Sequence, residues 1–192
     1  MPSLRISDFR NSSILRVYAE KDGIQTDPEY QPMGDVWNLD KRQLLIDTIL
    51  NDFDMPKLYF HELAQPKALD DGRSVKYAVI DGRQRLESIW GFIEGRFSLA
   101  DDFVFFEREN VKAGGMTYAD LAQEYPQLKT QIDSYTLPIT TVLTDDYDLI
   151  EEMFLRLNEA APLNAAEKRN AMGGPMADVI RWVSEHHFLL TK

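Results

Sequence analysis

The feature that most constrains this fold is a strand that runs into an amphipathic helix through the pentapeptide Asp-Gly-Arg-Gln-Arg at positions 81–85. Residues 75–80 are rich in β-branched and aromatic side chains and predict a strand. Residues 82–94 predict a helix, because Leu86, Ile93 and the apolar residues between them form one stripe. The pentapeptide therefore places several polar side chains together where a strand ends and a helix begins.

The remaining pattern predicts an α+β fold, because short strands are mixed with helices without a regular strand-helix alternation. A helix is expected over 39–50, with Asn38 as its N-cap. Other helices are expected over 118–124, 126–133 and 145–157, from 164 and over 175–188. Strands are expected over 57–60 and 135–143, a further strand or hairpin at Phe97 and 103–106, and a loop or hairpin turn over 65–73. We expect a single domain made of an N-terminal arm (1–29), an α+β core with the turn (30–143) and a helical segment completing the site (144–192).

Charge and composition restrict the classes of function. The net charge is -11, so the protein repels the DNA backbone except at a local basic patch, and DNA is disfavoured as a partner. There is no cysteine, which excludes disulfides, thiolate metal sites and cysteine nucleophiles. No secretory signal and no apolar run of membrane-spanning length is found, so we expect a cytoplasmic protein with no membrane partner.

Two residues of the turn have a purely structural interpretation. Asp81 is suited to be the N-cap of the helix, and Gln84, three residues later, completes a variant of the capping box. Capping would explain both residues without any function.

Capping does not explain Arg83 and Arg85. Both fall in the first helical turn, where the helix dipole already carries about half a positive charge, so each cation costs a few tenths of a kcal/mol. A local rule broken without local gain is typical of a functional site. A helix start with Gly82 for close approach and two guanidinium groups suits a phosphate. We expect one arginine to hold the ligand and the other to brace the site.

A second polar cluster lies toward the C-terminus. Arg156 and Asn158 end one predicted helix, and Arg169 and Asn170 follow in the next; all four suit base, sugar or phosphate binding. The structural alternative is that Arg156 pairs with Glu152 one turn earlier and that the later residues form a solvated face. Ligand binding is the favoured interpretation for Arg156 and Asn158. For Arg169 and Asn170 the binding and structural interpretations are equally supported.

These residues, in this order, resemble the N-terminal domain of GmrSD-type modification-dependent restriction enzymes, whose hallmark is an Asp-Gly-Gln-Gln-Arg turn. The matching positions are Tyr30-Gln31, Trp37, 45–50, Pro56, 81–86, 154–158, 162–164, Glu167 and 169–171. Two positions depart from the family pattern: Arg83 stands where the family usually has Gln, and Pro32 stands where an Arg commonly follows Tyr-Gln.

The resemblance implies a ParB/sulfiredoxin-like fold, a small mixed sheet with flanking helices and a helical C-terminal part. It also implies nucleotide binding at the turn and, as in several relatives, divalent-dependent hydrolysis of nucleoside triphosphates coupled to antiphage restriction. A sulfiredoxin-type reaction is excluded, because it needs a cysteine at this turn. The implied catalytic residues are Asp81, Gln84 and Arg85; the implied nucleotide ligands are Gly82, Arg83, Arg85, Arg156, Asn158, Arg169 and Asn170; and Mg²⁺ is the implied cofactor, with Asp81 as its candidate ligand.

The implied partners are a nucleotide and a nuclease domain or subunit, since nothing after Asn170 resembles an HNH-type nuclease site. Self-association is left open. Two other functions remain as alternatives: a non-enzymatic module that senses modified DNA, and a structural or partner-binding domain in which both polar clusters serve as caps and ion pairs.

Overall fold

The computed structural model describes residues 4–28, 36–108 and 110–160, which form a mixed sheet with helices around it. The strands are β1 (Arg5–Asp8), β2 (Ile24–Gln25), β3 (Leu58–Ala68), β4 (Ser74–Asp81) and β5 (Ile139–Leu143). The helices are α1 (Ile14–Ala19), α2 (Leu39–Leu50), α3 (Arg83–Ile93), α4 (Tyr118–Glu124), α5 (Pro126–Ser134) and α6 (Tyr147–Ala160), with a short 3₁₀ turn over Lys21–Gly23. The α+β class predicted from the sequence is confirmed.

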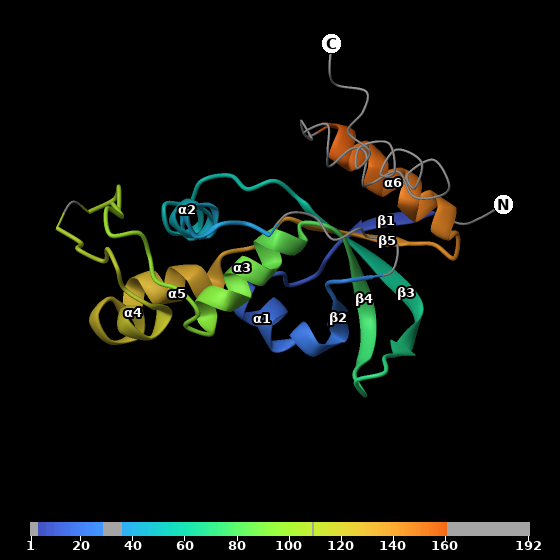
Figure 1. The fold of residues 1–192 in the computed structure, drawn as a ribbon, viewed down its shortest axis with the longest axis horizontal. Coiled ribbons are helices and arrows are strands. Elements are labelled where there is room, and N and C mark those ends of the chain that lie inside the picture. The colour runs from blue at the N-terminus through green and yellow to red at the C-terminus, as the bar shows by residue number, and fades with distance from the viewer. Residues whose placement is uncertain (1–3, 29–35, 109, 161–192) are drawn as a thin grey trace, which may run out of the picture.

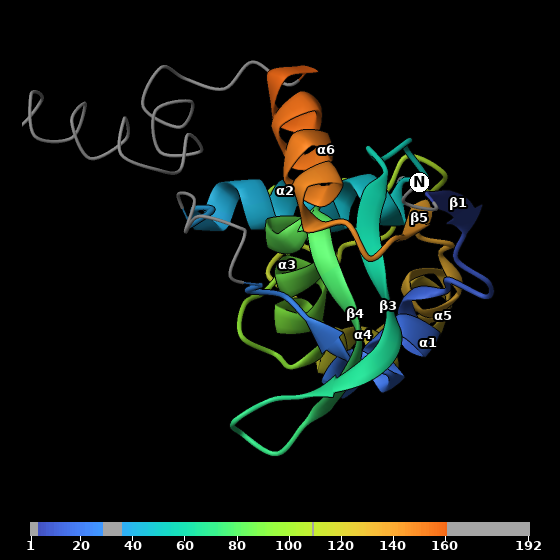
Figure 2. The ribbon, with the colours of Figure 1, turned by 90° about the vertical axis from the view of Figure 1, so that its right-hand side faces the viewer.

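The five strands lie in the order β1-β5-β3-β4-β2. β3 and β4 form a long antiparallel hairpin that projects from the body of the molecule (Figures 1 and 2). β5 lies parallel to β3 and antiparallel to β1, and β2 lies parallel to β4. The N-terminal segment therefore supplies both edge strands of the described sheet, and the hairpin lies inside it.

The two faces of the sheet are covered differently. Helices α1 to α5 contribute to one large core that includes Ile14, Ile46 and Phe92. Helix α6 lies apart from them (Figure 1), and its Ile150 and Phe154 pack on Ile80 of β4 and on Val142 of β5. Within the described residues, no helix is long and apolar enough to cross a membrane.

Several elements form where short-range sequence signals predicted them. Helix α2 has the expected bounds, and Asn38 caps it by accepting a hydrogen bond from the Lys41 amide at 3.0 Å. Helices α4 and α5 are also confirmed. The helices expected from 164 and over 175–188 lie outside the described residues.

The strand or hairpin expected at Phe97 and 103–106 is wrong, because no strand forms at these described positions. Its alternating pattern is real, since Phe103 and Phe105 are buried while Val104 and Phe106 are exposed. Its backbone, however, makes local turns, with the Phe103 amide bonded to Ala100 at 3.1 Å. Two buried rings at alternate positions can anchor a loop as well as a strand. Alternation of buried and exposed residues therefore does not by itself distinguish the two.

The loop expected over 65–73 is too long. Strand β3 continues to Ala68, and the turn is confined to a few residues in which the Leu69 amide bonds to Arg73 at 2.9 Å. A register shift between Glu62 and Lys67 marks a bulge, which accommodates Pro66 inside the strand.

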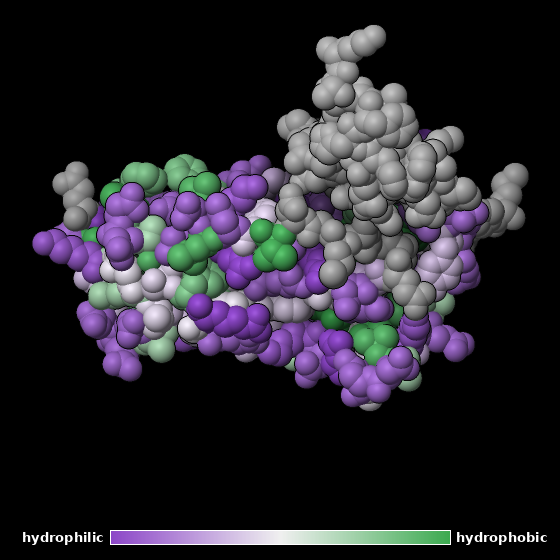
Figure 3. Space-filling view, in the orientation of Figure 1, coloured by the Kyte–Doolittle hydropathy of each residue, from purple (hydrophilic) through white to green (hydrophobic). Residues whose placement is uncertain are grey.

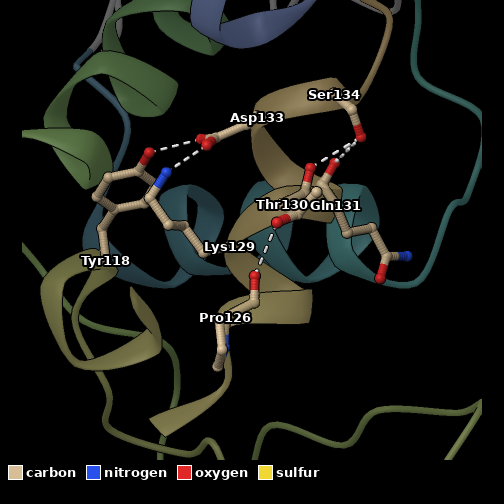
Figure 4. Close-up of polar contacts among 7 residues, drawn as sticks. All are labelled: Tyr118, Pro126, Lys129, Thr130, Gln131, Asp133 and Ser134. Carbon is tan, nitrogen blue, oxygen red and sulfur yellow. Dashed lines mark hydrogen bonds and ion pairs between the residues drawn. The ribbon is translucent and has the colours of Figure 1, made fainter. Parts of the chain in front are cut away.

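A polar cluster joins α4 to α5 (Figure 4). The Asp133 carboxylate accepts a hydrogen bond from the Tyr118 hydroxyl at 2.5 Å and pairs with Lys129, whose ammonium also lies over the Tyr118 ring. Burial raises the pKa of Tyr118, and so does its bond to Asp133. The pKa of Lys129 is raised chiefly by its bond to Asp133. This cluster fixes the two helices that lead into β5.

Candidate functional site

The Asp-Gly-Arg-Gln-Arg turn joins the end of β4 to the start of α3. Asp81 is the last residue of β4, Gly82 has φ +94° and ψ 12°, and Arg83 is the first residue of α3. This left-handed conformation favours glycine. A Cβ at Gly82 would lie 2.9 Å from Cγ and Cδ2 of Leu58, which is fully buried at the start of β3. Glycine is thus required twice, by backbone conformation and by space.

The predicted capping of α3 by Asp81 and Gln84 is wrong. Gly82 occupies the N-cap position, and no side chain caps the helix. Asp81 still belongs to the strand, one residue too early to reach the helix amides. The Gln84 Oε1 instead accepts a hydrogen bond from the Trp37 amide at 3.1 Å, which ties the entry to α2 to this turn.

Because no side chain caps α3, the backbone N–H groups of its first turn have no capping acceptor. An α-helix cannot satisfy its first amide groups internally, and the dipole adds positive potential at the same place. Here the first intrahelical bond runs from the Leu86 amide to Gly82 at 3.0 Å. The amides of Arg83, Gln84 and Arg85 therefore lie at a helix start that no side chain caps.

Both arginines are held by carboxylates one turn away, so the expectation that they bring no local gain is wrong. Arg85 donates to Asp81 Oδ2 and to the Pro56 carbonyl, each at 2.7 Å, and its side chain is only 12% exposed. Arg83 donates to Glu87 Oε1 at 2.9 Å, and its side chain is 24% exposed. Arg85 is thus fixed by two partners, one on β4 and one in the segment before β3, whereas Arg83, among the described residues, pairs only with Glu87 of its own helix.

The sequence missed three contributors to this geometry. Glu87 was detectable, because it lies four residues after Arg83 on the same helical face. The same spacing relates Asp81 to Arg85. The Pro56 carbonyl and the Leu58 side chain had no local signal, because both depend on how β3 lies beside β4, where Tyr59 stands opposite Asp81.

The second predicted cluster is only partly described. Arg156 lies on α6 and pairs with Glu152 through a 2.7 Å bond, as the structural alternative predicted, with its side chain 76% exposed. Within the described residues no hydrogen bond or ion pair joins Arg156 to the turn. Asn158 belongs to α6, but its side chain lies outside the described part, as do Arg169 and Asn170.

Helix α6 nevertheless lies close to the turn. Its Ile150 and Phe154 pack against Ile80, the residue directly before Asp81. The backbone that carries Arg156 and Asn158 is therefore attached to the strand end from which the turn departs.

Among the described residues, no group of three or more His, Cys, Asp or Glu side chains is arranged to hold a metal ion. A cleft of about 990 Å³ lies elsewhere, between β1, α1 and the β3–β4 hairpin, and its lining includes Arg5, Arg10 and Lys76. None of the predicted site residues lines it. The turn is therefore a partly buried polar helix start that lies outside that cleft.

Comparison with curated proteins and with solved structures gives no significant match. A family model does match: the one described as GmrSD restriction endonuclease, N-terminal domain, covers residues 14–172. The match includes the turn and every described helix from α1 to α6. The chain therefore belongs to the family of GmrSD restriction endonuclease N-terminal domains.

Proposed function

We propose that this restriction-system domain binds a nucleoside triphosphate, with the phosphates at the start of α3. One observation carries the proposal: an uncapped helix N-terminus follows a glycine in left-handed conformation directly at the end of a buried strand. Helix starts of this kind bind phosphate because several amides and the helix dipole point at the same place. The family match to a restriction endonuclease domain supports a regulatory use of that nucleotide.

The two arginines have different roles in this proposal. Exchanging the carboxylate partner of Arg83 for a phosphate costs little, since a partly exposed ion pair at the surface contributes about 0–1 kcal/mol. A guanidinium also binds phosphate through two parallel hydrogen bonds. Arg83 is therefore assigned to the ligand. Arg85, held by Asp81 and Pro56, is assigned to positioning.

Asp81 and Gln84 complete the turn. Asp81 gives one carboxylate oxygen to Arg85 and leaves Oδ1 for a water molecule, which suits orientation of an attacking water. Gln84 uses its oxygen for Trp37 and leaves its amide nitrogen to donate to a ligand. Arg156, Asn158, Arg169 and Asn170 are assigned as further ligands of the same nucleotide, as the family resemblance implies.

A single carboxylate at the turn fits Mg²⁺, because this ion is commonly bound by one or two carboxylates together with substrate phosphates and water. Asp81 would be the protein ligand. Bound there, the ion would neutralise phosphate charge during hydrolysis. Nucleotide binding is the primary function that we propose, and hydrolysis of the bound nucleotide is the secondary one.

Calorimetric titration with each nucleoside triphosphate, with and without Mg²⁺, tests the proposal. Arg83→Gln is expected to weaken binding about tenfold, because it removes one charge-assisted phosphate contact. Arg96→Gln is the matched control, since Arg96 is an exposed, ion-paired arginine just beyond the other end of α3. Equal affinity in wild type and Arg83→Gln, or equal losses in both variants, would refute the phosphate-binding role assigned to Arg83.

Titration of the same protein with plain and modified DNA duplexes distinguishes nucleotide binding from the main alternative, a module that senses DNA. A DNA-sensing module would bind duplex with a shallow salt dependence, because few phosphates can be contacted. Duplex binding that Arg83→Gln abolishes, together with no nucleotide binding, would replace the proposal by that alternative.

A further inference from the structure

Two phenylalanine rings are exposed side by side between the end of α2 and the loop after α3. Phe53 is 52% exposed and Phe106 is 66% exposed, and their ring centroids lie 5.9 Å apart in an edge-to-face arrangement. Val104, in the same loop, is 53% exposed. We call these three residues the aromatic patch.

Side-chain hydrogen bonds hold the backbone of the patch. The Asn51 side chain, at the C-cap of α2, donates to the Val104 carbonyl at 3.0 Å and accepts from the Phe106 amide at 2.9 Å. On the other side, the Tyr135 hydroxyl donates to the Phe53 carbonyl at 3.1 Å. A surface already fixed in place loses little conformational entropy when a partner binds. Isolated exposed apolar residues are ordinary, but a fixed group of them marks an interaction site.

Carboxylates surround the patch. Asp52, Asp54, Asp102 and Glu107 are exposed, and none of them has an ion-pair partner among the described residues. Figure 3 shows hydrophobic surface among hydrophilic surface over the part of the molecule where Figure 1 labels α2.

The titration of two neighbouring groups agrees with this charge distribution. Burial raises the pKa of Asp47, and the charge of Asp102 raises it further against the lowering effect of Asn51. Burial also raises the pKa of Tyr135, with further contributions from Asp52 and Asp54. The segments 52–54 and 102–108 carry the four surrounding carboxylates and one exposed cation, Arg108, so the patch lies in a region of net negative charge.

We propose that the aromatic patch is a docking surface for a basic protein partner, one with apolar side chains flanked by lysine and arginine. Apolar contact would bury the rings, and the flanking cations would meet the unpaired carboxylates and the ring faces. A second copy of this chain would bring like charges together, and an anionic membrane or DNA would be repelled. This site is separate from the nucleotide site, because it uses the end of α2 and the 104–106 loop rather than the turn at Gly82.

The test uses the full chain and two labelled amphipathic peptides. The first has leucine and tryptophan on one helical face and lysine and arginine on the other; the second has glutamate in place of every cation. Fluorescence anisotropy is expected to show binding of the basic peptide alone, weakening as salt is added. Phe53→Ser and Phe106→Ser are each expected to reduce its affinity about tenfold or more.

Charge variants and a control make the test specific. Asp52→Asn combined with Asp54→Asn is expected to reduce affinity about threefold to tenfold and to flatten the salt dependence. Leu15→Ser, which alters an exposed leucine on α1, is the matched control and is expected to bind as wild type does.

Three results would overturn the proposal: no binding of the basic peptide, equal binding of both peptides, or equal losses in the control. Sedimentation that shows a dimer dissociated by Phe53→Ser would assign the patch to a second copy instead. Nucleotide titration of Phe53→Ser is expected to match wild type, so the docking and nucleotide proposals can fail separately.

Discussion

Replacing Gly82 by alanine is expected to lower the free energy of unfolding by about 2–5 kcal/mol. About 1–2 kcal/mol comes from forcing a residue with a side chain into the left-handed conformation at φ +94°. About 1–3 kcal/mol more comes from overpacking, since the new Cβ would lie 2.9 Å from Leu58. Leu58 is fully buried and cannot move away freely.

Chemical denaturation separates the conformational cost from the overpacking cost. Four proteins are compared: wild type, Gly82→Ala, Leu58→Ala and the double variant. Leu58→Ala alone is expected to cost about 2–5 kcal/mol, because it opens a cavity. In that background the cavity receives the new methyl group, so Gly82→Ala should retain only its conformational cost of about 1–2 kcal/mol.

Gly72 provides the matched control. It has φ +86° in the exposed β3–β4 turn, and a Cβ there would meet nothing within 4 Å. Gly72→Ala should therefore cost about 1–2 kcal/mol, the conformational contribution alone. Equal costs of Gly82→Ala with and without Leu58, or a cost no larger than that of Gly72→Ala, would refute the claim that Leu58 encloses the turn.

Two further predictions concern titratable groups away from the turn. Asp133→Asn is expected to lower the free energy of unfolding by about 1–3 kcal/mol, because the carboxylate accepts from both Tyr118 and Lys129. Since the pKa values of Tyr118 and Lys129 are both raised in the fold, wild-type stability should fall as the pH rises past about 10, and denaturation midpoints across that range should change less in the variant. Asp47→Asn is expected to stabilise the protein slightly at pH 7, by a few tenths of a kcal/mol after screening, because burial raises the pKa of this carboxyl and disfavours its charge. The gain should vanish below about pH 4, where the unfolded carboxyl is also protonated; a gain that persists there, in urea denaturation, would contradict the reasoning.

The parts of the fold that the sequence predicted are those set by neighbouring residues. Helix α2 follows from an apolar stripe and the Asn38 cap, and both lie within one short segment. The 103–106 loop could not be distinguished from a strand, because burial of Phe103 and Phe105 produces the same alternation. Only the backbone partners of that segment differ, and those are not encoded locally.

The candidate site shows the same limit. The polar turn was predicted in place, and the spacing of Asp81 and Arg85 was available as an ion-pair signal. The assignment of Asp81 as N-cap failed by one residue, because the left-handed Gly82 separates the strand from the helix. Its fit against Leu58 depends on strand register, which no local pattern specifies.

The central claim is that the start of α3 receives the phosphates of a nucleotide. Backbone amide resonances recorded by nuclear magnetic resonance during addition of a nucleoside triphosphate with Mg²⁺ test it most directly. We predict saturable shifts at Arg83, Gln84 and Arg85, the residues of the uncapped helix start. Shifts confined to the cleft lined by Arg5 and Arg10, or no shifts at all, would contradict the claim.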